Sequence, residues 1–148
     1  MSNVAANSIS LLFDGRSQSV AAVTKVTQIC ELVYPDRIKP GENAIVACKI
    51  NGIQRDLWSD VAEGDYVETI AIDSPEGLAI LRHSTAHVLA QSVQATFSQT
   101  RLGIGPPIKD GFYYDFDPKN PFTPEDLQKL ESAMRKIIKD GQRFRRRV

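Results

Sequence analysis

Two histidines are the residues of this sequence best suited to chemistry. His83 and His87 are the two histidines of the 148-residue chain, and they stand four positions apart in a stretch that reads as a helix. Side chains four apart on a helix project from one face, with Cβ atoms roughly 5–6 Å apart. A neutral imidazole can accept a proton from a water molecule that it positions. The pair therefore suits hydrolysis, and its spacing equally fits two ordinary helix-surface or partly buried histidines.

A metal site is not predicted at this pair. Ser84 follows the first histidine, so the chain lacks the His-Glu-x-x-His pattern in which zinc proteases carry a glutamate base. Zinc sites need three or four protein ligands, and Cys30 and Cys48 lie far upstream in what reads as another domain. We expect both cysteines to be buried thiols rather than metal ligands or part of a disulfide framework.

A glycine- and proline-rich turn and an aromatic segment follow the histidine helix, which is predicted over residues 76–97. In residues 103–107, glycines such as Gly105 permit close approach of the backbone to a ligand, and two prolines stiffen the segment. Tyr113 and Tyr114 are predicted to alternate across a strand, so one faces the core and the other can face a pocket. A plain connecting turn is equally consistent with residues 103–107, and packing in the core equally explains either tyrosine.

A second helix is predicted from its end signals. Thr123 is a capping residue, Pro124 favours the first helical position, and Gly141 ends the pattern. The expected buried stripe consists of Leu127, Leu130, Met134, Ile137 and Ile138.

The first half of the chain has the pattern of a small sheet with one helix. Strands are predicted at residues 8–13, 18–22, 44–50, 53–57 and 66–72, with Asp-Gly and Asn-Gly turns at residues 14–15 and 51–52. Thr24 is expected to cap a helix ended by Pro35. This ββαββ order with a further strand predicts a β-grasp (ubiquitin-like) fold in an α+β chain. The junction at residues 73–77 divides it into residues 1–74 and 75–148.

Four short motifs follow one another in the second half. They are His83-Ser84-Thr85-Ala86-His87, Gly105-Pro106-Pro107-Ile108, Gly111-Phe112-Tyr113-Tyr114-Asp115 and Pro121-Phe122-Thr123-Pro124-Glu125-Asp126-Leu127. In this order and spacing they resemble the start of the editing domain of bacterial threonyl-tRNA synthetases. The first half resembles the small TGS domain that precedes editing in that family, and the likeness runs from about Ser8 to Val148.

The resemblance implies one role within a longer enzyme. In that family the editing domain hydrolyses serine wrongly attached to threonine tRNA, at a site that joins the histidine pair to a later Cys-x-x-x-His motif. It implies catalytic roles for His83 and His87 and substrate contacts for Tyr114 and Gly105. Because the sequence ends at Val148 before a second motif, we expect an N-terminal fragment that is inactive alone. No cofactor or metal is expected in it; ATP, Mg²⁺, Zn²⁺ and homodimer contacts are implied elsewhere, with threonine tRNA as partner.

Bulk properties favour a cytoplasmic protein without a membrane span, since no apolar run approaches the ~20 residues that a span needs. The formal net charge is zero, but acids outnumber bases before His83 and a basic run, Arg143 to Arg147, closes the chain. That run suits contacts with tRNA phosphates and is equally typical of a solvated chain end.

Two other functions remain open at this point. The chain can be a β-grasp binding or regulatory module with a structural helix pair, a reading against which the histidine motif argues. It can also be a zinc-dependent trans-editing hydrolase of the alanyl-tRNA synthetase type, a reading against which the shortage of ligands argues.

Overall fold

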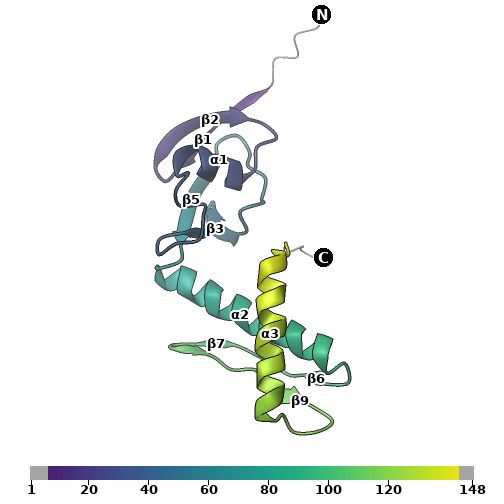
Figure 1. Ribbon diagram of the computed structural model, residues 1–148. Coiled ribbons are helices and arrows are strands. Elements are labelled where there is room, and N and C mark those ends of the chain that lie inside the picture. The colour runs from purple at the N-terminus through teal and green to yellow at the C-terminus, as the bar shows by residue number, and fades with distance from the viewer. Residues whose placement is uncertain (1–6, 144–148) are drawn as a thin grey trace, which may run out of the picture. The chain divides into compact units, whose positions relative to one another are not determined.

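The computed structural model describes residues 7–143, and the chain forms two compact units, Met1–Leu78 and Ala79–Val148 (Figure 1). Three helices and a mixed sheet confirm the predicted α+β class. Helix α2, Pro75–Thr96, begins within the first unit and continues into the second. Within residues 7–143, no helix has the length and apolar character needed to cross a membrane.

The first unit is a five-stranded sheet with one helix. Its elements are β1 (Ser8–Phe13), β2 (Arg16–Ala21), α1 (Val26–Val33), β3 (Ile45–Ile50), β4 (Ile53–Arg55) and β5 (Tyr66–Ala71). The strand order is β2-β1-β5-β3-β4; β1 and β5 are parallel and the other neighbours antiparallel. Both predicted two-residue turns are present, with φ of 47° and 79° at residues 14–15 and 53° and 81° at 51–52. Such positive φ angles define the turn that matches strand twist.

Side-chain alternation along β1 builds the core of this unit. Leu11 and Phe13 are buried while Leu12 is exposed, so one face of the sheet packs on α1. The buried cluster consists of Leu11, Phe13, Val26, Ile29, Cys30, Ile45, Cys48, Val61 and Val67. Both cysteines are therefore buried thiols, as predicted.

The predicted cap of α1 was wrong by one residue. Lys25, not Thr24, is the N-cap, and its backbone N–H donates to Oε1 of Gln28 at 2.8 Å. Gln28, the third residue of the helix, thus satisfies the N–H of the N-cap residue, which is one half of a capping box.

The second unit combines α2 and α3, Pro124–Asp140, with a two-stranded ribbon between them. The ribbon pairs β6 (Arg101–Leu102) with β9 (Phe116–Asp117) and β7 (Pro107–Ile108) with β8 (Gly111–Phe112). Between these short pairs, the Gly103 N–H donates to the Asp115 carbonyl at 2.8 Å and the Asp115 N–H to the Ile104 carbonyl at 3.0 Å. Residues 101–117 therefore form one irregular hairpin (Figure 1).

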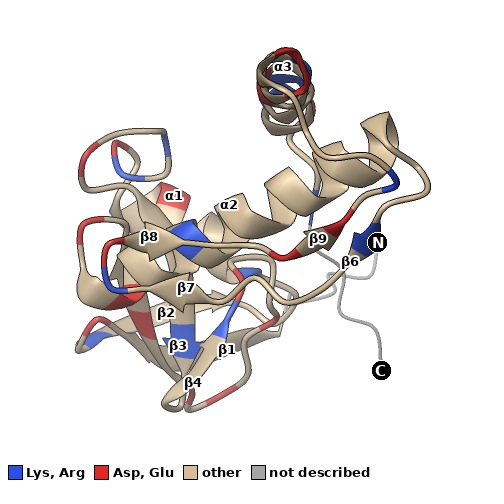
Figure 2. Cartoon of the chain, turned by 90° about the horizontal axis from the view of Figure 1, so that it is seen from below, with Lys and Arg blue, Asp and Glu red and all other residues tan. Residues whose placement is uncertain are grey.

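Both ends of α3 carry the predicted signals. Thr123 Oγ1 accepts from the Asp126 N–H at 3.3 Å, the Asp126 carboxylate accepts from the Thr123 N–H at 3.0 Å, and Gly141 closes the helix with φ of 59°. Acidic and basic residues both lie on this helix, which Figure 2 shows end-on. They include an ion pair of 2.7 Å between Glu131 and Arg135.

The predicted buried stripe of α3 was only partly right. Leu130 is buried and Met134 and Ile137 are half-buried, whereas Leu127 and Ile138 are 59% and 64% exposed. At 100° per residue these two side chains lie about 60–80° around the helix from Leu130, at the border of its apolar face. The covered face of α3 is therefore narrower than the predicted stripe.

Candidate functional site

The two histidines point at each other from one face of α2. Their Nε2 atoms are 3.0 Å apart, and their rings meet edge to face at 85° with centroids 4.5 Å apart. Both side chains are exposed. At this distance one Nε2 can donate a hydrogen bond that the other accepts, and which ring does which depends on the tautomer. The prediction that the pair shares one helical face is confirmed.

Packing on the neighbouring side of α2 fixes where the pair sits. Ala86 and Ala90 are 0% and 4% exposed, and they lie next to the histidines around the helix. Other parts of the unit therefore cover the side of the helix that carries these two alanines. The helix therefore presents the two rings outward from a closely packed surface.

Gly105 and Tyr114, the predicted substrate contacts, lie against each other. A Cβ atom built on Gly105 would be 2.0 Å from Cδ2 of the tyrosine ring, so no other residue fits there without movement. The Tyr114 ring is half-buried and stacks on Phe116, with centroids 4.8 Å apart and planes 15° apart. The absence of a side chain at Gly105 therefore makes room for the ring of Tyr114, which belongs to this same chain.

The predicted strand through the two tyrosines is absent from this region. Residues 113–115 lie between β8 and β9, in the gap between the two short strand pairs. In this gap Asp115 forms backbone hydrogen bonds with residues 103 and 104. Tyr113 is 47% exposed and Tyr114 half-buried, so the two rings still have different surroundings. No hydrogen bond or ring contact joins the Gly105 and Tyr114 pair to the histidine pair within residues 7–143.

The described part of the chain places no third metal ligand beside the two imidazoles. Across residues 7–143, no group of three or more His, Cys, Asp or Glu side chains is placed to hold one ion. Cys30 and Cys48 belong to the first unit, where burial raises the pKa of each thiol to about 12. A buried, protonated thiol is a poor ligand and a poor nucleophile.

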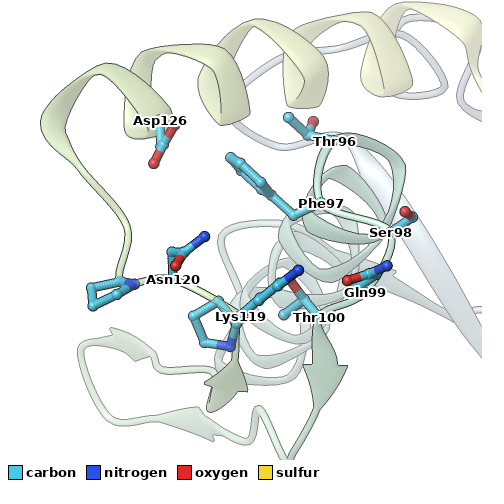
Figure 3. A pocket seen from close by; sticks show the side chains of 10 residues that line it. Thr96, Phe97, Ser98, Gln99, Thr100, Lys119, Asn120 and Asp126 are labelled. Carbon is cyan, nitrogen blue, oxygen red and sulfur yellow. The ribbon is translucent and has the colours of Figure 1, made fainter.

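A cavity of about 350 Å³ lies in the second unit, where α2 ends and the chain turns toward α3 (Figure 3). Its lining includes Phe97, Gln99, Lys119 and Asn120. None of the four predicted site residues lines it. The sequence analysis missed this cavity because its residues share no spacing pattern.

Two further positions bear on the site. Arg82, which precedes the first histidine, donates through Nη1 to the Lys109 carbonyl at 2.6 Å, a contact that no sequence pattern indicated. Arg143, the first residue of the predicted basic run, is exposed. The rest of that run, up to Arg147, lies outside the described residues, so its contact with RNA stays a prediction.

Comparison with known proteins relates the chain to one enzyme family. No family model matches. Threonine–tRNA ligases of Nocardioides sp. and Parafrankia sp. are 56% and 60% identical over 126 and 108 residues, which are 85% and 73% of this chain. The ligase of Bifidobacterium longum is 48% identical over 139 residues, or 94% of the chain. These matches span 16–19% of the relatives' own length. The chain therefore belongs with the bacterial threonine–tRNA ligases, as a homologue of one segment of those enzymes.

Proposed function

We propose that this chain is the N-terminal region of a threonine–tRNA ligase and contributes there to hydrolytic editing of serine attached to threonine tRNA. The observation that carries the proposal is the pair of exposed imidazoles with Nε2 atoms 3.0 Å apart. Homology to the ligases supplies the substrate class. We further propose that the first unit is a β-grasp module, which the five-stranded sheet covered by one helix supports.

The need for editing follows from how alike the two amino acids are. Serine and threonine share a hydroxyl and differ by one methyl group. One such group in a binding pocket discriminates by only ~10–200-fold. A second, hydrolytic pocket that admits serine and excludes threonine by size corrects the remaining errors.

The histidine pair can serve ester hydrolysis by ordinary acid and base chemistry. Water attacks the ester carbonyl carbon and gives up a proton, and the ribose oxygen leaves with a proton, so the products are serine and tRNA. A neutral Nε2 accepts the first proton, and an imidazole N–H can donate the second. His83 and His87 share these roles in the proposal, with neither assigned as the base.

Other parts of the enzyme would complete this site. We propose that a Cys-x-x-x-His motif closes it, that ATP, Mg²⁺ and Zn²⁺ bind elsewhere in the ligase, and that the whole protein acts as a homodimer on threonine tRNA in the cytoplasm. This chain alone is expected to be inactive toward seryl-tRNA. Within residues 7–143, the histidine pair belongs to no larger group of His, Cys, Asp or Glu side chains that could hold a metal ion, which supports that expectation.

The test is the double change His83→Ala and His87→Ala in a complete threonine–tRNA ligase carrying this segment. Deacylation of preformed seryl-tRNA should fall by ~10²–10⁴-fold, the usual contribution of acid and base groups, while threonylation is nearly intact. Gln94→Ala is the matched control, since this exposed residue lies on the same face of α2. Unchanged deacylation in a well-folded double variant would remove both histidines from the mechanism.

The same assay separates the zinc-dependent alternative. Two imidazoles that point at each other could also act as two ligands of one zinc ion. A third ligand would have to come from outside residues 7–143. Deacylation that a chelator abolishes and zinc restores would favour that alternative. Activity that a chelator leaves unchanged supports direct acid and base chemistry.

A further inference from the structure

Arg82 links the histidine helix to the far end of the irregular hairpin. It immediately precedes His83 in α2, and its Nη1 donates to the Lys109 carbonyl at 2.6 Å. Lys109 and Asp110 form the turn between β7 and β8, which is the tip of the hairpin (Figure 1). A contact across 27 positions of sequence thus ties this tip to the helix.

Aromatic packing holds the opposite end of the hairpin. Phe116 in β9 stacks on Tyr114 at 4.8 Å and meets Phe122 edge to face at 6.0 Å. Phe122 in turn packs on Phe97, just after α2, with centroids 5.4 Å apart. These rings form a continuous cluster, so the base of the hairpin is fixed by several contacts at once.

Burial does not hold the tip in the same way. All four residues from Pro107 to Asp110 are exposed, and Ile108 is 49% exposed. Strands of two residues give the tip little stability of their own. A hydrogen bond from a charged donor is therefore a large part of what restrains it.

Gly105 lies between these two anchors, in the section without regular strand pairing, and contacts the ring of Tyr114, which belongs to the aromatic cluster. Where these two residues stand relative to the histidines therefore depends on the aromatic cluster at one end and on Arg82 at the other. We propose that Arg82 is a positioning residue, which holds the substrate-binding segment of the hairpin in register with the histidine pair. This inference rests on the proposed editing function.

The chemistry of arginine fits this role. The guanidinium is a hydrogen-bond donor only and takes no part in the proposed proton transfers, so its bond to Lys109 serves position alone. Loss of Arg82 should therefore lower the rate without changing the shape of the pH profile. Loss of a histidine should change that shape, because one of the proposed acid and base groups is removed.

The first test measures the tip in this 148-residue chain. Lys-C and Asp-N proteases cut the same bond, Lys109–Asp110, and cleavage follows how often the tip opens. Arg82→Ala should speed this cleavage about tenfold, the effect of losing one charged hydrogen bond. Arg135→Ala is the control, because it removes an equal charge from α3. Equal cleavage in both variants would overturn the proposal.

The second test measures seryl-tRNA deacylation in a complete ligase carrying the same changes. Arg82→Ala should lower kcat/KM about tenfold, mostly through KM, because substrate contacts are displaced while the histidines stay intact. His83→Ala should instead lower kcat. Arg82→Lys retains a cationic donor and should recover part of the loss; if Arg82→Ala fails to fold, this variant alone should still raise KM above wild type.

The outcomes separate this inference from the proposed function. Deacylation that survives loss of both histidines would refute the role in editing that is proposed for the histidine pair. Deacylation that needs the histidines but is equal in Arg82→Ala and Arg135→Ala would overturn only the positioning role. A loosened tip with wild-type KM and kcat would do the same.

Discussion

Replacement of Gly105 by alanine tests how tightly the predicted substrate segment is built. The new Cβ atom would lie 2.0 Å from Cδ2 of Tyr114, whereas carbon atoms in contact are about 3.5 Å apart. The ring must therefore retreat by about 1.5 Å, and its stack on Phe116 opposes this movement. Overpacking of this kind costs about 1–3 kcal/mol. In a unit of this size each 1 kcal/mol lowers Tm by about 4–8 °C.

Gly111→Ala is the matched control on the same hairpin. A Cβ atom at Gly111 meets nothing within 4 Å, and its φ angle is not in the left-handed region. Its effect should be near zero or slightly stabilising, because alanine restricts the unfolded chain. Chemical and thermal unfolding, followed by circular dichroism of α2 and α3, measures both variants.

Tyr114→Ala supplies the decisive comparison. If the clash with the tyrosine ring explains the cost, Gly105→Ala should change the free energy of unfolding by less than about 0.5 kcal/mol once the ring is absent. The coupling between the two changes should then equal the 1–3 kcal/mol cost of the single change. An equal cost with and without the ring would refute the close contact between Gly105 and Tyr114.

Three further predictions concern other parts of the chain. Burial raises the pKa of Cys30 and Cys48 from 9.0 to about 12, so labelling by a thiol reagent at pH 8 should track unfolding, and stability should fall as pH rises above 9. Gly77→Ala places a Cβ atom 1.9 Å from a backbone carbonyl oxygen and should lower Tm far more than Gly41→Ala, where that atom meets nothing. The backbone N–H of Thr123, the N-cap residue of α3, donates to the Asp126 carboxylate and lowers its pKa below 3.8. Stability should therefore decline as pH falls below 3.8. In acid titrations of unfolding, Asp126→Asn should weaken that decline.

Features set by short-range rules could be predicted from the sequence. The histidine pair meets because helical geometry alone brings residues four apart together. The turns at residues 14–15 and 51–52 follow from the residues that tolerate positive φ. Both ends of α3 follow from Thr123 and Gly141, whose roles are local.

Features set by contacts between distant residues could not be predicted. Arg82 reaches a backbone carbonyl, which any residue offers, so no residue type marks its partner. Residues 113–115 lie outside the strands, and Asp115 bonds to residues 103 and 104 across the hairpin, partners that alternation within one segment does not reveal. The exposure of Leu127 and Ile138 depends on how far the packing around Leu130 extends, and periodicity specifies only a direction.

The two units differ in how much apolar surface they bury, and this difference predicts how they unfold. In the first unit, a continuous cluster that includes Phe13, Ile29 and Val67 is closed to solvent. Within residues 79–143, the buried apolar side chains are Ala86, Ala90, Val93 and Leu130, which are mostly small. Burial stabilises by about 25 cal/mol per Å² of apolar area, so the second unit has much less to hold it.

Hydrogen exchange should therefore be faster in α3 than in β1 and β5. The editing proposal fits this ranking, because a site completed by other parts of a ligase would also gain its stability from them. Mass spectrometry of exchange in this chain, compared with a complete ligase carrying it, measures both effects. Protection of α3 should rise in the complete ligase while protection of β1 stays nearly constant. Equal protection of α3 in the two proteins would show that the second unit folds independently and would contradict this reasoning.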